Sequence, residues 1–486
     1  MPNIVDRFNV NGQDFFIEPV LDNAPTEGSQ HGISSNGVYQ TLMDFFGTSD
    51  SEKWKAALLG SVYGFNWNDP ELLPFSTVPY ALVWNDELYV ASFTQLTDTY
   101  ESTLYKYVDG SLAIVEVFTC DKKTCMQPLF QMGDKVYILD KCSSDMEHWT
   151  SITLNTASTY SKGPLSNGVY ADGIYLLDCR EKLNILRSTD GIVFSSVQAA
   201  GISTGAAESY SYTKLSYIKG RFFWCPGGIW SEAIQYSVDG SSWTIATHDF
   251  TPSSTSRSNA TEVQFSRGKY LVGFTTDAFI SSTNAQYCVL SSSDGITFTS
   301  ETIATSSTST IGSPYLATTP DAAVAAVTDT SSGVQTFKAF NGSSWATTSA
   351  PSGYSLYISM TAPYNGTYIR SANYSQSNPV NLLTSDGFNW MPCPYPRNMS
   401  TPKAAGSKSN LCYFATASHT SSGFDLILSL DGYIWRKSGY TYTDAFTAVS
   451  VWYAGLMKGV PVLILTAYMV IEGVTTYKHY IQTAKL

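Results

Sequence analysis

Four acidic residues in segments predicted to be loops have side chains of the type that can cleave glycosidic bonds: Glu101, Glu208, Asp277 and Asp444. Glycoside hydrolysis needs two carboxyl groups on opposite sides of a cleft, one as an acid and one as a base or nucleophile. The chain has 40 acidic residues, and no local pattern pairs these four. It contains no G-x-S-x-G, H-E-x-x-H or P-loop pattern. The sequence therefore predicts no catalytic residue, and a glycan-cleaving enzyme remains the alternative to a glycan-binding protein.

Aromatic residues in other predicted loops favour binding. A Tyr or Trp ring can stack on a sugar while its polar tip hydrogen-bonds a hydroxyl group. The candidate stacking residues are Tyr210, Tyr212, Trp230, Tyr395, Tyr440 and Tyr442. Arg257 and Arg397 could pair with an acidic sugar or a phosphate. Because the chain has 32 tyrosines, the alternative that these rings only cover strand edges stays open.

Charge and composition limit the other partners. A formal net charge of −12 argues against nucleic acid as a partner. The longest apolar run, residues 460–471, is too short to cross a bilayer as a helix and is predicted to be a buried strand, so membrane insertion is not expected. The five histidines and eight cysteines are not spaced as metal ligands. We therefore expect no metal and no other cofactor.

A repeated octapeptide indicates which elements hold the loops. A Ser or Thr, an Asp-Gly pair and an aromatic residue recur at one spacing, as in YSVDGSSW (236–243). The aspartates of the five good copies are Asp190, Asp239, Asp294, Asp386 and Asp431. Weaker copies centre on Tyr63, Asp109, Asp145 and Asn341. The resulting period of about 45 residues is typical of four-stranded propeller blades.

Each octapeptide is predicted to form a turn lock, the hydrogen-bonded connection between the third and fourth strands of a unit. The Gly supplies the positive φ of a two-residue hairpin turn. The Asp carboxylate and the Ser or Thr hydroxyl accept hydrogen bonds from N–H groups that the strand ladder leaves unpaired. The aromatic residue returns to the strand and packs between neighbouring sheets.

The octapeptide resembles the Asp-box of sialidase-like propellers, although here the Asp and Gly are adjacent, which makes the motif one residue shorter. The resemblance implies an all-β, Asp-box β-propeller whose turn locks face away from the ligand-binding loops. Sialidases also have an arginine triad and an F/Y-R-I-P segment. With nine arginines and no such segment in this chain, sialidase activity is not expected.

The propeller is predicted to span residues 61–486. Nine units begin near residues 80, 126, 167, 212, 260, 312, 356, 404 and 446. The second is short and is expected to lack a strand, which favours about eight four-stranded blades, with seven or nine as alternatives. The last unit lacks its own fourth strand, and residues 61–73 could supply it, because joining the two ends of the ring hides exposed strand edges.

Residues 1–60 lie outside the repeat, with short helices expected near 38–47 and 50–60. DNAPTEGSQHGISSNGVYQTL (22–42) resembles a stretch found near the N-terminus of bacteriophage head-fibre and tail-fibre proteins. The matching residues include Pro25, Thr26, Gly28, Gly37, Val38, Tyr39 and Leu42. The resemblance implies attachment to other virion proteins of the capsid, neck or tail, and oligomerisation, often as a trimer. The alternative is an ordinary extension packed under the propeller.

Together, these features predict a virion protein, assembled in the cytoplasm of the bacterial host, whose propeller binds host surface polysaccharide. A glycoside hydrolase or depolymerase on the same scaffold is one alternative. A capsid decoration fibre with weak, general surface affinity is another.

Overall fold

The computed structural model shows an all-β protein. It describes residues 7–10, 13–16, 66–121, 126, 128–155, 168–179, 184–198, 214–225, 234–249, 258–276, 285–306, 315–329, 333–356, 360–361, 369–372, 381–392, 400, 402–407, 410–418, 423–429, 435–442, 448–471 and 474–485. Within these residues every regular element is a β-strand.

Nine largely antiparallel sheets of four to six strands follow one another along the described chain. The first sheet contains β5 (Tyr80–Trp84), β6 (Glu87–Gln95), β7 (Thr99–Val108) and β8 (Ser111–Asp121). The second contains β9 (Phe130–Met132), β10 (Lys135–Ile138), β11 (Lys141–Ser143) and β12 (Thr150–Ser151). The third contains β13 (Thr153–Asn155), β14 (Gly168–Ala171), β15 (Ile174–Cys179), β16 (Asn184–Ser188) and β17 (Val193–Gln198). The fourth sheet contains β18 (Lys214–Ile218), β19 (Arg221–Cys225), β20 (Gln235–Ser237) and β21 (Thr244–Ile245). The fifth contains β22 (Thr247–His248), β23 (Ser258–Ala260), β24 (Gln264–Ser266), β25 (Lys269–Thr276), β26 (Ala285–Ser292) and β27 (Thr297–Ser306). The sixth contains β28 (Tyr315–Thr319), β29 (Ala322–Thr328), β30 (Gln335–Phe340) and β31 (Trp345–Thr347). The seventh sheet contains β32 (Met360–Thr361), β33 (Ile369–Ala372), β34 (Asn381–Thr384) and β35 (Met391–Pro392). The eighth contains β36 (Lys403–Ser407), β37 (Asn410–Ser418), β38 (Phe424–Ser429) and β39 (Arg436–Tyr442). The ninth contains β40 (Ala448–Met457), β41 (Val460–Ile471) and β42 (Val474–Lys485), and β3 (Asn66–Trp67) and β4 (Glu71–Leu72) also belong to it.

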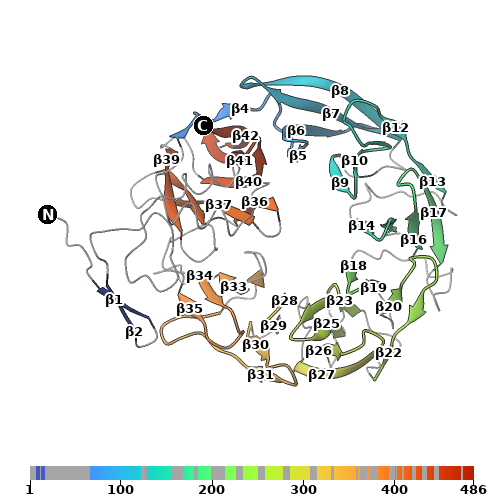
Figure 1. Ribbon diagram of the computed structural model, residues 1–486, viewed down its shortest axis with the longest axis vertical. Coiled ribbons are helices and arrows are strands. Elements are labelled where there is room, and N and C mark those ends of the chain that lie inside the picture. The colour runs from blue at the N-terminus through green and yellow to red at the C-terminus, as the bar shows by residue number, and fades with distance from the viewer. Residues whose placement is uncertain are drawn as a thin grey trace.

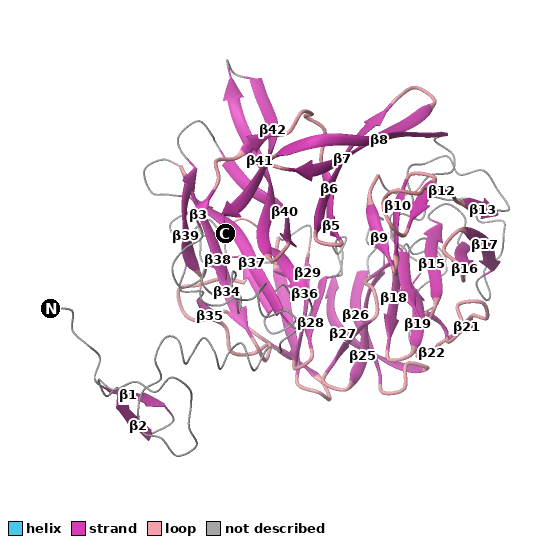
Figure 2. Ribbon diagram, turned by 45° about the horizontal axis from the view of Figure 1, so that its top comes forward, coloured by secondary structure: helices cyan, strands magenta, loops and turns pink. Residues whose placement is uncertain are grey.

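The sheets are arranged around a ring in chain order (Figure 1). Most strands that are consecutive in sequence are also neighbours in their sheet; the exceptions are β13, which pairs with β17, β22, which pairs with β27, and the pairs β23–β24 and β3–β4, which lie beside β25 and β42. Early strands such as β5, β9 and β18 lie nearer the middle of the ring than β8, β17 and β27. The tilted view in Figure 2 shows the strands running across the thickness of the ring. This radial arrangement of four-stranded sheets is that of a β-propeller.

The middle strands are apolar on both faces because each sheet is covered by a neighbour on either side. On β19, Phe222 and Trp224 belong to a core cluster shared with the preceding sheet, whereas Phe223 and Cys225 belong to a cluster shared with the following one. All four side chains are fully buried. This explains why β19 reads as a continuous apolar run instead of alternating with polar residues.

Two sheets gain an outer strand from the chain that leaves the preceding sheet. β13 pairs in parallel with β17, and β22 pairs in parallel with β27. At the first crossing, the N–H of Ile152 donates to Asp140 of its own sheet, and the N–H of Thr153 donates to Ile192 of the next. Successive backbone hydrogen bonds thus join adjacent sheets, a feature that the sequence analysis did not anticipate.

The two ends of the repeat region share one sheet. Asn66 and Trp67 of β3 pair with Lys485 and Ala484 of β42, and β4 pairs with the same strand further along. The side chain of Trp67 is 6% exposed and lies in a core cluster with residues of β37, β40 and β41.

The all-β class with four-stranded sheets is confirmed. The expectation that the second unit lacks a strand was wrong, because β12 pairs with β11 and completes a four-stranded sheet. Near the N-terminus, β1 (Arg7–Val10) and β2 (Gln13–Phe16) form a hairpin that was not expected. The helices expected in 38–60 lie outside the described residues, as do all seven attachment residues: Pro25, Thr26, Gly28, Gly37, Val38, Tyr39 and Leu42.

Candidate functional site

The turn locks form one dense, recurring network. In the third sheet, the Ser188 hydroxyl donates to the carboxylate of Asp190 at 2.7 Å and accepts from the N–H of Gly191 at 2.9 Å. The same Asp190 oxygen accepts from the N–H groups of Ile192 and Val193. Equivalent bonds surround Asp239, Asp294 and Asp386, and the degenerate copy at Asp145. Asp431 lies outside the described residues.

The connections that carry these networks are longer than the two-residue turns expected from the sequence. The last paired residues of β16 and β17 are Arg187 and Ser195, so the connection runs from residue 188 to residue 194. A two-residue turn does occur in the first sheet, where Val108 pairs with Ser111 across Asp109 and Gly110. The difference arises because the Ser and Asp side chains bond N–H groups up to three residues ahead, which holds a wider loop.

Three of the turn locks also contact the preceding sheet. The Tyr137 hydroxyl donates to the carbonyl oxygen of Gly191 at 3.0 Å, and Arg187 Nε donates to that of Asp239 at 2.9 Å. Arg221 donates in the same way to the carbonyl oxygen of Asp294. The turn locks therefore join neighbouring sheets in addition to closing hairpins.

The carboxylates of the turn locks make stability depend on pH. Donation from the backbone N–H groups of Thr297 and Ile296 lowers the pKa of Asp294 to about 2. Because the folded-state pKa lies below the unfolded value near 3.9, this contribution is present above about pH 4 and is lost as the pH falls towards about 2. We expect the thermal midpoint, followed by circular dichroism, to fall steeply across this range.

A variant in which Asp190, Asp239, Asp294 and Asp386 are all replaced by Asn is the matched control. Asn341 already occupies the equivalent position in the sixth sheet, where its amide oxygen accepts from the N–H groups of Ser343 and Ser344. The Asn variant should keep these acceptors without titrating, so its midpoint should vary less between pH 4 and 2. Identical profiles for the two proteins would show that other carboxylates cause the acid sensitivity.

The predicted glycan-binding residues fall into two groups. Tyr210, Tyr212, Trp230, Arg257, Tyr395 and Arg397 lie outside the described residues. Tyr442 is 2% exposed and donates a hydrogen bond from its hydroxyl to Gln482, so both its ring and its polar tip are engaged inside the protein. That burial removes Tyr442 from the candidates for sugar stacking. Tyr440 is half-buried, packs against Tyr442 and donates to Asp69 at 3.2 Å.

Of the four carboxylates predicted to lie in loops, only Glu101 is among the described residues, and it lies in a strand instead of a loop. Glu101 is on β7, paired with Thr94 of β6 and Thr119 of β8. Glu208, Asp277 and Asp444 lie outside the described residues. Among the described residues, no group of three His, Cys, Asp or Glu side chains is arranged to hold a metal ion.

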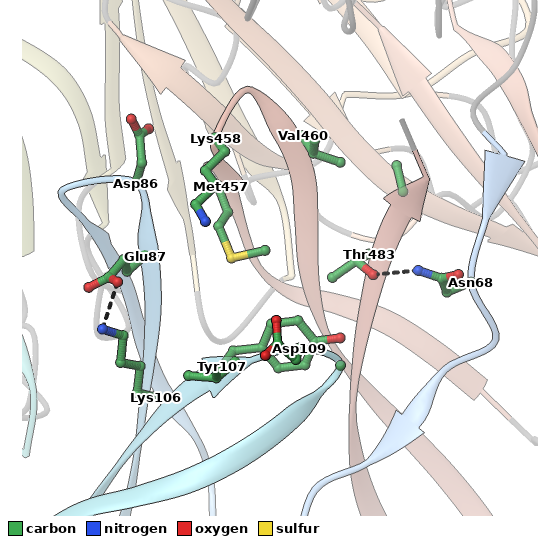
Figure 3. Close-up of a pocket in the computed structure, with 13 residues that line it drawn as sticks. Asn68, Asp86, Glu87, Lys106, Tyr107, Asp109, Met457, Lys458, Val460 and Thr483 are labelled. Atoms are coloured by element: carbon green, nitrogen blue, oxygen red, sulfur yellow. Dashed lines mark hydrogen bonds and ion pairs between the residues drawn. The ribbon is translucent and has the colours of Figure 1, made fainter.

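A cavity of about 450 Å³ lies between the first and last sheets, and we call it the seam pocket (Figure 3). Three two-residue hairpins border it: Asn85–Asp86 between β5 and β6, Asp109–Gly110 between β7 and β8, and Lys458–Gly459 between β40 and β41. The remaining wall comes from Asn68 and from the end of β42. The lining residues are Asn68, Asp86, Glu87, Lys106, Tyr107, Val108, Asp109, Gly110, Met457, Lys458, Val460, Thr483 and Ala484.

The polar side chains of the seam pocket are held in place. Lys106 Nζ lies 2.6 Å from Glu87 Oε1, and the Tyr89 hydroxyl donates to Glu87 Oε2 at 2.9 Å. The hydrogen bond from Lys106 lowers the pKa of Glu87, so this carboxylate stays ionised at neutral pH. On the opposite wall, Asn68 Nδ2 donates to Thr483 Oγ1 at 2.8 Å.

Sequence reasoning missed the seam pocket. Its hairpins have local signals, since Asn-Asp, Asp-Gly and Lys-Gly pairs suit turns with positive φ. Nothing in those signals shows that residues 68, 109 and 458 meet. Their meeting depends on β3 and β4 pairing with β42.

Comparison with known proteins identifies no family. No protein-family model and no curated protein matches the chain. Among solved structures, a puromycin hydrolase is similar at 11% identity and a TM-score of 0.38, over 85% of this chain and 60% of its own. The β-propeller domain of the trilobed protease from Pyrococcus furiosus is similar at 9% identity and a TM-score of 0.34, over 78% and 99%. A family 117 glycoside hydrolase from Zobellia galactanivorans is similar at 9% and 0.21, over 46% and 83%. Likenesses at these scores carry no argument about activity.

The described residues include no helix that is long and apolar enough to cross a membrane.

Proposed function

We propose that the chain is a bacteriophage structural protein that binds host cell-surface glycan. In this proposal, residues 1–60 attach it to other virion proteins, in a trimer, and residues 61–486 form an Asp-box propeller in which each of the nine sheets is one blade. The turn locks at Asp190, Asp239, Asp294 and Asp386 support the Asp-box assignment, because they recur at the same connection of their sheets. The pairing of β3 and β4 with β42 supports a ring whose ends meet in one sheet.

One observation carries the binding proposal: the strand ends that bound the aromatic loops gather on one face. Because neighbouring strands are antiparallel, the ends at Cys225 and Gln235, which bound the segment with Trp230, lie opposite the turn lock at Asp239. The ends at Pro392 and Lys403, which bound the segment with Tyr395 and Arg397, leave their sheets on that same face. The proposal therefore assigns the aromatic residues of these segments to a single surface, as a glycan-binding surface requires.

Binding of the purified protein to host cells and to an array of bacterial surface polysaccharides tests this proposal. Replacing Trp230 and Tyr395 with Ala should weaken binding at least tenfold, because buried aromatic residues dominate the energy of such contacts. The control is Tyr170→Ala, an exposed ring that lies next to the hairpin Asp172–Gly173 on the turn-lock face. A chain without residues 1–60 should still bind glycan but should no longer enter particles.

Three outcomes would contradict parts of this proposal. Unchanged binding in the Trp230 and Tyr395 variants would exclude the loop face. Normal particle incorporation without residues 1–60 would exclude the attachment role. Depolymerisation of the bound polysaccharide would establish the hydrolase alternative.

A further inference from the structure

The seam pocket is separate from the loop face. Asp86 and Lys458 lie in connections between first and second strands, and Asp109 lies in the connection between a third and a fourth strand. In antiparallel sheets these connections share one face, which is also the face of the turn locks. A ligand in the seam pocket would therefore contact a surface that the proposed host-binding function does not use.

Both hydrogen-bond donors and acceptors line the seam pocket. Figure 3 shows Asp86, Glu87 and Asp109 on the side of the first sheet, with Lys106 beside Glu87 and Lys458 reaching in from the last sheet. An ionised carboxylate can only accept hydrogen bonds, and an ammonium group can only donate them. The amide of Asn68 and the hydroxyl of Thr483 on the opposite wall can do both.

The charges of the lining select against an anionic ligand. Three carboxylates and two ammonium groups line the pocket, and the closest pair, Glu87 and Lys106, neutralises itself at 2.6 Å. Together these five groups give the lining a net charge of −1, which repels an anionic ligand. A neutral molecule with adjacent hydroxyl groups can donate to the carboxylates and accept from the ammonium groups at the same time.

The size and the apolar part of the wall agree with such a ligand. A volume of about 450 Å³ lies in the usual range of small-molecule sites, about 300–1,000 Å³. Val460 and Ala484 are buried in the wall, and Met457 and the half-buried ring of Tyr107 add apolar surface. An aromatic side chain such as Tyr107 can pack against the C–H groups on one face of a sugar ring. We infer that the seam pocket binds a neutral sugar unit through the Glu87–Lys106 pair, Asp109 and Asn68.

Titration of the full chain with free glucose, galactose and mannose, followed by calorimetry, tests this inference. We expect at least one of these hexoses to bind saturably, while N-acetylneuraminic acid, which carries a negative charge, binds at least tenfold more weakly. Glu87→Gln should weaken hexose binding at least tenfold because it removes the charged acceptor and releases Lys106. Asp109→Asn is a second variant, since Asn also tolerates the positive φ of 49° at this position.

Glu116→Gln is the matched control, because Glu116 is an exposed carboxylate on β8 outside the pocket. The thermal midpoint of each variant shows whether it is folded. Three results would overturn the inference: no saturable binding of any of the three hexoses, hexose affinity unchanged in both folded pocket variants, or tighter binding of N-acetylneuraminic acid than of the hexoses. The readout uses free sugar and purified protein, so it does not depend on whether the host-binding proposal holds.

Discussion

Replacing Trp67 with Ala is expected to lower the free energy of unfolding by about 3–5 kcal/mol, the usual cost of removing a large buried aromatic side chain. Trp67 lies on β3, and its ring meets that of Phe414 edge to face, with the centroids 6.1 Å apart. Its removal would leave a cavity between the last two sheets. The cavity would form where β3 joins the beginning of the repeat region to β42, so we also expect this junction to open first.

Chemical denaturation followed by tryptophan fluorescence and circular dichroism measures this effect. Leu72→Ala is the matched control: Leu72 lies on β4 in the same segment, but its side chain is 53% exposed. Its substitution should change the unfolding free energy by less than about 0.5 kcal/mol. Equal midpoints for the Trp67 and Leu72 variants would mean that the β3 junction contributes nothing to stability.

Gly191→Ala is expected to cost about 2–4 kcal/mol, from two sources. Gly191 has a φ of 69°, which an L-residue adopts at a cost of about 1 kcal/mol. A Cβ at Gly191 would also lie 2.6 Å from the Tyr137 hydroxyl and 3.0 Å from Lys135 Cδ, both in the preceding sheet. Tyr137 is fully buried and hydrogen-bonded to Gly191, so it cannot move aside freely, and overpacking adds about 1–3 kcal/mol.

Gly173→Ala separates these two sources. Gly173 has a similar φ of 75°, but nothing lies within 4 Å of its added Cβ. Its substitution should therefore cost only the backbone term, about 1 kcal/mol. If the two alanine variants unfold at the same denaturant concentration, the turn locks do not hold adjacent sheets together through close packing.

The turn locks were largely predictable from the sequence because their interactions are local. The Ser188 and Asp190 oxygens bond N–H groups no more than three residues away, so the octapeptide itself contains nearly every partner. The first strands of most sheets begin within a few residues of the expected positions, as β5 does at Tyr80 and β36 at Lys403, whereas the outer strands β13 and β22 begin earlier than expected. The width of the turn was not predicted, because it depends on which side-chain bonds prevail over the strand ladder.

Contacts between sheets were decided by the tertiary structure alone. The burial of Tyr442 against Gln482, the approach of Tyr137 to Gly191 and the strand exchange at β13 all join residues that are far apart in the sequence. The seam pocket is the clearest case, since its walls come from residues as distant as Asn68 and Ala484.

The sequence by itself therefore determined the repeating unit and its turns, because short-range hydrogen bonds and positive-φ glycines are encoded within a few residues. Only the tertiary structure decided which turns meet and which aromatic rings are buried. These outcomes depend on how apolar faces of separate sheets pack, and many sequences of similar composition can satisfy that packing in different ways.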